Sequence, residues 1–110
     1  MKLPDSAFTP IALANLALKA EVGESGRSLS RTFEQGGVRL RLVEYGPGYL
    51  ADHWCDRGHV FHVIVGEVTV ELKDGRAFAL GAGESFVVSD FGDAPHRVRA
   101  HGGGTAFIAD

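Results

Sequence analysis

Residues 48–59, with the sequence GYLADHWCDRGH, hold two histidines, the only cysteine and the only tryptophan of the 110-residue chain. His53 and Cys55 are two positions apart, and His59 follows Cys55 four positions later. Imidazole nitrogens and a thiolate sulfur are ligands that bind zinc, copper, nickel and iron, whereas magnesium and calcium prefer oxygen ligands. The segment is therefore a candidate transition-metal site.

The spacing predicts how these side chains lie if the segment folds as a β-hairpin. Alternate residues of a strand project to the same face, so His53 and Cys55 share a face. Residues 56–58, Asp-Arg-Gly, have the form of a three-residue hairpin loop with glycine last. Such a loop sets Cys55 opposite His59 and His53 opposite Phe61, and opposed residues project to the same side. The hairpin is thus expected to bring three metal ligands together.

The other three histidines have different expected roles. Continued pairing of the hairpin sets Asp52 opposite His62 on the other face, so we interpret His62 as a paired structural residue. His96 begins a strand after a polar loop and is the best candidate for a fourth ligand. His101 lies beside three glycines, and we interpret it as a solvated turn residue. The predicted metal ligands are His53, Cys55, His59 and His96.

The strands that must position these residues are short and antiparallel. Glycines recur at short intervals from Gly36 onward, which is typical of a sandwich or barrel. The Asp-Gly pair within residues 73–76 predicts a two-residue hairpin turn. Residues 11–16 are expected to form a short helical piece after Pro10. Roughly nine strands fit a jelly-roll barrel, and they are expected over residues 18–22, 28–34, 38–45, 49–55, 60–72, 77–80, 85–89, 96–100 and 105–109.

Two strands carry arginines at alternate positions. Val38, Leu40 and Leu42 alternate with two arginines, and we expect this apolar face to line the core. Arg97 and Arg99 are interpreted as a solvated strand face, although either arginine could bind an anionic ligand near the barrel mouth.

Composition limits the class of protein. The length is that of one domain, spanning residues 1–110, with a sizeable core. The net charge of -3 leaves no basic face for nucleic acid. No apolar run reaches the roughly 20 residues that a membrane span needs, and we interpret residues 10–20 as part of the fold. One cysteine cannot form an internal disulfide, so the expected location is the reducing cytoplasm.

From Pro47 onward the chain resembles the cupin superfamily. The first cupin motif has a glycine, a His-x-His pair, a glutamate and a second glycine in that order. Cys55 stands here at the place of the second histidine and His59 at that of the glutamate. The five matching positions are Gly48, His53, Cys55, His59 and Gly66.

A closer resemblance is to a subgroup of small single-domain cupins named for a DHCW motif, which here reads Asp-His-Trp-Cys at residues 52–55. The second cupin motif is looser. It spans Gly83 to His96, with Ser89 in place of a proline, and Ala100 stands where the motif has a terminal asparagine. The resemblance covers residues 38–110.

The resemblance implies an all-β, single-domain jelly-roll barrel with a short helical or irregular N-terminal segment. It also implies a divalent transition metal, such as zinc, iron, nickel or copper, near the barrel mouth. The expected function is that of a metal-dependent enzyme of oxygenase or isomerase type acting on a small molecule. A non-catalytic metal-binding or ligand-sensing module and a structural metal site in a homodimer are the alternatives. The family also implies a homodimer, with the N-terminal apolar segment as a possible contact.

Overall fold

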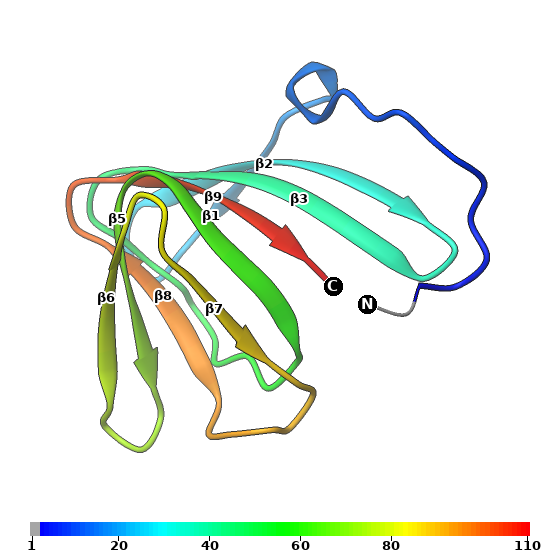
Figure 1. Cartoon of the computed structure of the whole chain (residues 1–110). Helices are drawn as coiled ribbons and strands as arrows, with labels where there is room; N and C mark the ends of the chain where they lie inside the picture. Colours follow the sequence, from blue (N-terminus) through cyan, green and yellow to red (C-terminus); the bar gives the residue numbers. More distant parts are fainter. Residues whose placement is uncertain (1–2) are drawn as a thin grey trace.

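The computed structural model describes residues 3–110 and consists almost entirely of β-strands (Figure 1). Within this range a 3-10 helix, η1 (Leu13–Asn15), lies inside the helical piece expected at residues 11–16. None of the described helical structure is long and apolar enough to cross a bilayer. The expected all-β fold is confirmed. Its strands are β1 (Lys19–Val22), β2 (Arg27–Gln35), β3 (Val38–Tyr45), β4 (Tyr49–Leu50), β5 (His59–Leu72), β6 (Ala77–Gly81), β7 (Ser85–Val88), β8 (His96–Ala100) and β9 (Gly104–Ala109).

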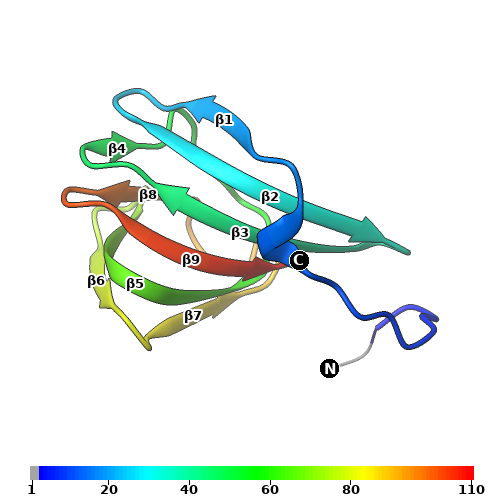
Figure 2. The ribbon, with the colours of Figure 1, turned by 90° about the horizontal axis from the view of Figure 1, so that it is seen from above.

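Strand β5 joins the two halves of the barrel. Its first half pairs with β7 and β9, and its second half pairs with β6 and β8. The hydrogen-bonded path runs β1-β2-β3-β9-β5-β8-β4, with every named pair antiparallel. A bridge between Ser25 and Leu50 brings the β1–β2 hairpin back beside β4 (Figure 2). The curled sheet has the form expected of a jelly-roll barrel.

Gly66 lies where β5 passes from one half of the barrel to the other. The register of β5 against β9 shifts between Val63 and Val65, just before this glycine. Gly66 has a φ of 75°, and a Cβ added there would lie 2.5 Å from the carbonyl oxygen of Gly103. Both the left-handed backbone and the close approach of a second chain segment therefore require glycine.

The core lies inside the curled sheet and is centred on Phe61. Phe61 is 1% exposed, and its ring stacks on Phe86 at 4.9 Å and on Tyr45 at 6.4 Å between centroids. Val63 and Val68 are equally buried on the same strand, one on each side of the bend. The inward side chains of β5 thus anchor both halves.

The alternation of apolar residues predicts that the face of β3 with Val38, Leu40 and Leu42 points inward. In the structure the opposite face of β3 points inward. Val43 and Tyr45 belong to the buried core. Because alternate residues share a face, Arg39 and Arg41 also point inward, and they line an interior cavity. The expectation that the leucine face lines the core is therefore wrong.

The N-terminal segment partly covers the outer face of β3. Leu3 and Ile11 line one crevice together with Phe33, Val38 and Leu40. Residues 3–10 are themselves exposed, with Phe8 98% exposed, so the cover is incomplete. The homodimer contact expected of this segment stays a prediction.

The carboxylate of Asp110 pairs with the charges of the two inward arginines, Arg39 and Arg41. Its carboxylate accepts hydrogen bonds from Arg39 Nε at 2.8 Å and Nη2 at 2.9 Å, and from Arg41 Nη2 at 3.0 Å. The backbones of Arg39 and Asp110 also exchange two N–H···O bonds. Burial alone would raise the pKa of Asp110, but the arginine hydrogen bonds and charges outweigh it and hold the pKa below its usual value. The cluster ties β3 to the end of β9.

Gly66→Ala is expected to lower the free energy of unfolding by roughly 2–4 kcal/mol, because the new methyl combines left-handed strain with a backbone clash. Gly48 is the matched control, since its φ is 76° but an added Cβ would meet nothing within 4 Å. Gly48→Ala should cost only about 1 kcal/mol. Urea unfolding of both variants measures the difference, and equal losses would refute the clash.

Asp110→Asn is expected to lower stability by roughly 1–2 kcal/mol at pH 7 in metal-free protein, because two partly buried arginines lose their counter-charge. The folded-state pKa of Asp110 lies below its ordinary value of 3.8. The contribution is therefore fully present above that value and is lost as the pH falls through the depressed pKa. Urea unfolding of both proteins should give curves of stability against pH that converge in acid. A difference that persists unchanged there would contradict the ion-pair explanation.

Candidate metal centre

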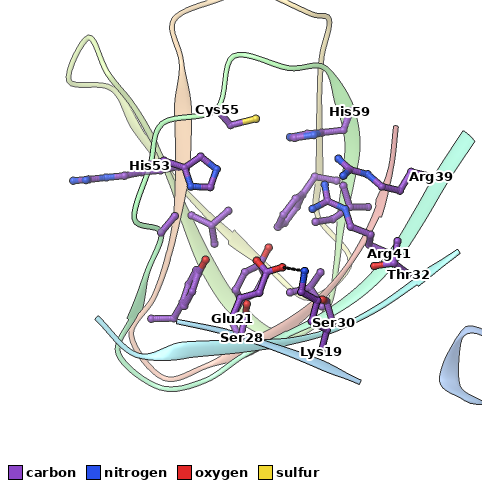
Figure 3. Close-up of a pocket in the computed structure, with 18 of the residues that line it drawn as sticks. Lys19, Glu21, Ser28, Ser30, Thr32, Arg39, Arg41, His53, Cys55 and His59 are labelled. Atoms are coloured by element: carbon purple, nitrogen blue, oxygen red, sulfur yellow. Dashed lines mark ion pairs between the residues drawn. The ribbon is translucent and has the colours of Figure 1, made fainter. Parts of the chain in front are cut away.

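Three of the four predicted ligands lie together. One ligand atom from each of Cys55, His59 and His96 falls within 4.8 Å of the other two. His59 begins β5, His96 begins β8, and Cys55 lies in the segment between β4 and β5. Figure 3 shows the sulfur of Cys55 directed toward the ring of His59 across one end of a cavity.

Backbone pairing positions Cys55 against β8. Cys55 N–H donates to the carbonyl of His96 at 2.7 Å, and His96 N–H donates to the carbonyl of Cys55 at 2.8 Å. Ala51 N–H also donates to the carbonyl of Val98 in β8, at 3.0 Å. The two-bond bridge places the thiol of Cys55 beside the imidazole of His96.

The predicted hairpin between Cys55 and His59 is wrong. The expected strand 49–55 ends at Leu50, and His59 pairs with Val88 of β7 instead of Cys55. The loop at 56–58 packs on the turn after β7, since Gly58 N–H donates to Asp90 Oδ1 at 2.6 Å. Gly58 is needed there for close approach, because a Cβ would lie 2.6 Å from the backbone nitrogen of Asp90. The Cys55 thiol and the His59 imidazole are therefore brought together by different strands: Cys55 is paired with β8, and His59 is paired with β7.

His53 lies outside the group of three. Its side chain is 77% exposed, and Nδ1 lies 2.6 Å from Asp52 Oδ1. It lines the cavity but does not join the converging ligand atoms of the described residues. The physical reason is that residues 51–54 do not continue as a strand, so the two-residue alternation that would align His53 with Cys55 does not apply. The ligand role of each residue stays a prediction.

Burial favours the neutral form of the two clustered imidazoles. Burial lowers the pKa of His59, against the opposing effect of Asp110, and burial with the nearby charge of His59 lowers the pKa of His96. Their Nε2 atoms are 2.8 Å apart, so both face one point. Neutral imidazole is the form that binds metal.

Asp110 also lies behind His59. Its Oδ2 is 3.4 Å from His59 Nδ1, and that buried nitrogen has no hydrogen-bond partner of good geometry within residues 3–110. A carboxylate on the far nitrogen of a metal-binding histidine orients the ring and strengthens it as a ligand. Asp110 therefore connects the arginine cluster to the candidate metal centre.

The remaining histidines are not at this centre. His62 Nδ1 lies 2.6 Å from Ser85 Oγ, so the expected pairing with Asp52 is wrong and the partner comes from β7. His101 lies exposed in the turn between β8 and β9, as expected of a solvated turn residue.

Arg97 and Arg99 form a strand face that is only partly solvated, with 21% and 37% of the side chains exposed, and Arg97 lines the cavity. Both Nε atoms donate to Glu71 Oε1, at 3.2 and 3.3 Å. The guanidinium of Arg97 also lies 4.3 Å from the ring centroid of Trp54. These arginines are occupied by partners on the barrel wall.

The candidate centre opens on a cavity of about 390 Å³. Sequence reasoning missed its polar wall, which is formed by side chains of β2 and β3: Ser28, Ser30, Thr32, Arg39 and Arg41. Lys19 and Glu21 of β1 form an ion pair at 3.5 Å along the same cavity (Figure 3). The signal that could have revealed this wall is the shared parity of Arg41, Val43 and Tyr45, since a buried tyrosine turns the arginines inward.

Searches with the sequence find no matching protein-family model and no matching curated protein. Comparison with solved structures finds similar folds. The polyketide cyclase RemF from Streptomyces resistomycificus aligns with a TM-score of 0.72 and 16% identity, over 94% of this chain and 78% of that one. Ectoine synthase from P. lautus gives 0.72 and 16%, over 93% and 76%.

A cupin-2 domain containing protein from Shewanella frigidimarina aligns with a TM-score of 0.59 and 21% identity, over 74% of this chain and 78% of that one. At identities this low the likeness shows the fold alone. The narrower resemblance to DHCW-motif cupins stays a prediction. The chain has the cupin fold.

Proposed function

We propose that this protein binds one divalent transition metal through Cys55, His59 and His96 and uses it to act on a small molecule in the adjoining cavity. The observation that carries the proposal is the convergence of three metal-binding atoms at the wall of that cavity.

The residues present fit such an ion. One thiol and two neutral imidazoles are a common ligand set for zinc, and they also suit iron, nickel and copper. The buried Nδ1 of His59 is turned toward the Asp110 carboxylate, which leaves Nε2 for the metal. The ligand identity, the tautomer and the burial therefore agree with one another.

An open coordination position favours catalysis over a structural role. Structural zinc sites are closed by four protein ligands, whereas catalytic sites keep a position for water or substrate. Within residues 3–110 the group contains three such ligands, and the cavity lies beside it. A bound metal would supply Lewis acidity or redox chemistry at this position. The chain's own contribution is to orient the ligands and to shape the cavity. Two proteins of similar fold are named as a cyclase and a synthase, which supports a catalytic use of such a barrel.

One observation favours the second candidate, a non-catalytic module that binds a metal or small ligand. The carboxylates that line the cavity are Glu21, paired with Lys19, and Glu34, exposed on β2. Neither is a buried, unpaired carboxylate of the kind that serves as a general base.

Metal analysis of protein purified without a histidine tag tests the proposal. We expect one equivalent of zinc, iron, nickel or copper per chain, either as isolated or after reconstitution. Absence of stoichiometric metal in both preparations would refute both proposed functions that involve a metal, the enzyme and the non-catalytic metal-binding module. With metal present, oxygen consumption or turnover of a small molecule favours the enzyme, and tight but inert ligand binding favours the module.

Cys55→Ser is expected to abolish most of the stabilisation that zinc gives. Metal at about 100 times its Kd stabilises the folded state by roughly 2.7 kcal/mol, and the variant should lose most of this gain. Thermal unfolding with zinc and with chelator measures it.

His53→Gln is the matched control, because His53 lies outside the group of three. It should keep the zinc-dependent gain in full. Equal losses for Cys55→Ser with zinc and with chelator would show that Cys55 is merely packed, and loss of the gain in His53→Gln would show that His53 is a ligand after all.

A further inference from the structure

Arg41 has hydrogen-bonding capacity that the fold does not use. Its Nη2 donates to Asp110, but its Nε is buried and has no partner among the described residues. Leaving a buried donor of a charged group unpaired is costly, and such a group usually has a partner in the functional state. The side chain lines the 390 Å³ cavity, so a ligand there would lie beside the guanidinium, although Nε itself is covered in this structure.

The two arginines of β3 have only one carboxylate of residues 3–110 in direct contact with them. Arg39 and Arg41 share the single carboxylate of Asp110. Lys19 and Glu21 neutralise each other at 3.5 Å. Glu34 lies opposite Arg39 on β2 and its charge acts on Arg39, but it is exposed and forms no ion pair with either arginine in the described chain. Arg41 therefore has only the carboxylate that it shares with Arg39, and an anionic group of a ligand would supply a second partner.

The rest of the cavity wall is polar and close to the candidate metal centre. Figure 3 shows Arg41 between His59 on one side and the hydroxyl-bearing Ser30 and Thr32 on the other. Asp110 Oδ2 lies 3.0 Å from Arg41 Nη2 and 3.4 Å from His59 Nδ1, so one carboxylate spans the two groups. A ligand held by Arg41 would therefore extend toward the metal ligands.

We propose that the cavity binds a small organic carboxylate, whose carboxylate accepts hydrogen bonds from Arg41 while its remaining atoms face Cys55, His59 and His96. This names the substrate class of the proposed metal centre and rests on that function. A carboxylate fits better than a phosphate, because a guanidinium binds the planar group through two donors and a dianion would face the Asp110 carboxylate with excess negative charge.

The test follows the Arg41 Hε–Nε resonance of ¹⁵N-labelled, metal-free protein by NMR. The probes are acetate, pyruvate and benzoate, the matched uncharged amides, and inorganic phosphate. We expect saturable shifts with at least one carboxylate, none with its amide, and weaker binding of phosphate. Equal shifts with acid and amide, tighter binding of phosphate, or no shift with any acid would overturn the proposal. This measurement uses the unaltered chain and so does not depend on a variant that folds.

Arg41→Gln should weaken carboxylate binding about tenfold or more, since it removes charge-assisted hydrogen bonds. Arg99→Gln is the matched control, because Arg99 pairs with Glu71 and does not line the cavity, and it should bind as the parent protein does. Unchanged affinity in Arg41→Gln would also overturn the proposal.

Zinc uptake, measured on the same samples, separates this proposal from the metal function. Arg41-dependent carboxylate binding in a protein that takes up no zinc would support the anion subsite and refute the metal centre. Zinc uptake without Arg41-dependent binding would refute the subsite and leave the metal centre intact.

Discussion

The pair of backbone hydrogen bonds between Cys55 and His96 is the constraint on which the candidate centre depends. Residues 51–58 run from β4 to β5 without forming a strand. The bridge to His96 fixes the backbone of Cys55 itself, between the bond from Ala51 N–H to Val98 and the bond from Phe91 N–H to Asp56. The bridge pairs Cys55 with His96, the first residue of β8, and β5 presents His59 from the other half of the barrel. A site that three separate chain segments build is held by the whole barrel and not by a local turn.

Asp110 links three properties that the fold keeps in one place. It neutralises the arginines that β3 turns inward, it ties β3 to the end of β9, and it stands behind the ring of His59. Charged groups are costly to bury unless they are paired and hydrogen-bonded. The ion pairs with Asp110 therefore offset the cost of turning Arg39 and Arg41 inward. Because they point inward, these two arginines form part of the polar wall of the cavity.

Much of the fold could be predicted from the sequence, because it rests on local signals. The Asp74-Gly75 pair and the long apolar strand after His59 predict a hairpin, and the structure has one between β5 and β6. Its loop is three residues, 73–75, and not the two predicted, because Leu72 N–H donates to the carbonyl of Arg76 and Gly75 takes the left-handed conformation at the end of the loop. Cys55, His59 and His96 could be selected because metal-binding residue types are rare and were close in sequence or at a strand start. These signals do not require knowledge of which strands are neighbours.

The errors come from long-range pairing. A short loop with glycine last predicted a hairpin, but Gly58 serves close packing against Asp90, and His53 consequently lies outside the group. The face of β3 was misassigned because Asp110, far away in sequence, neutralises the inward arginines, and because the N-terminal segment partly covers the apolar side. Alternation identifies two faces of a strand, and only the neighbouring strands decide which is inside.

X-ray absorption at the zinc edge of the reconstituted protein tests the central claim most directly. The account predicts one sulfur ligand at about 2.3 Å and two imidazole nitrogens at about 2.0–2.1 Å, with a lighter atom completing the sphere. A spectrum with only nitrogen and oxygen neighbours, or a protein that retains no zinc to measure, would contradict it.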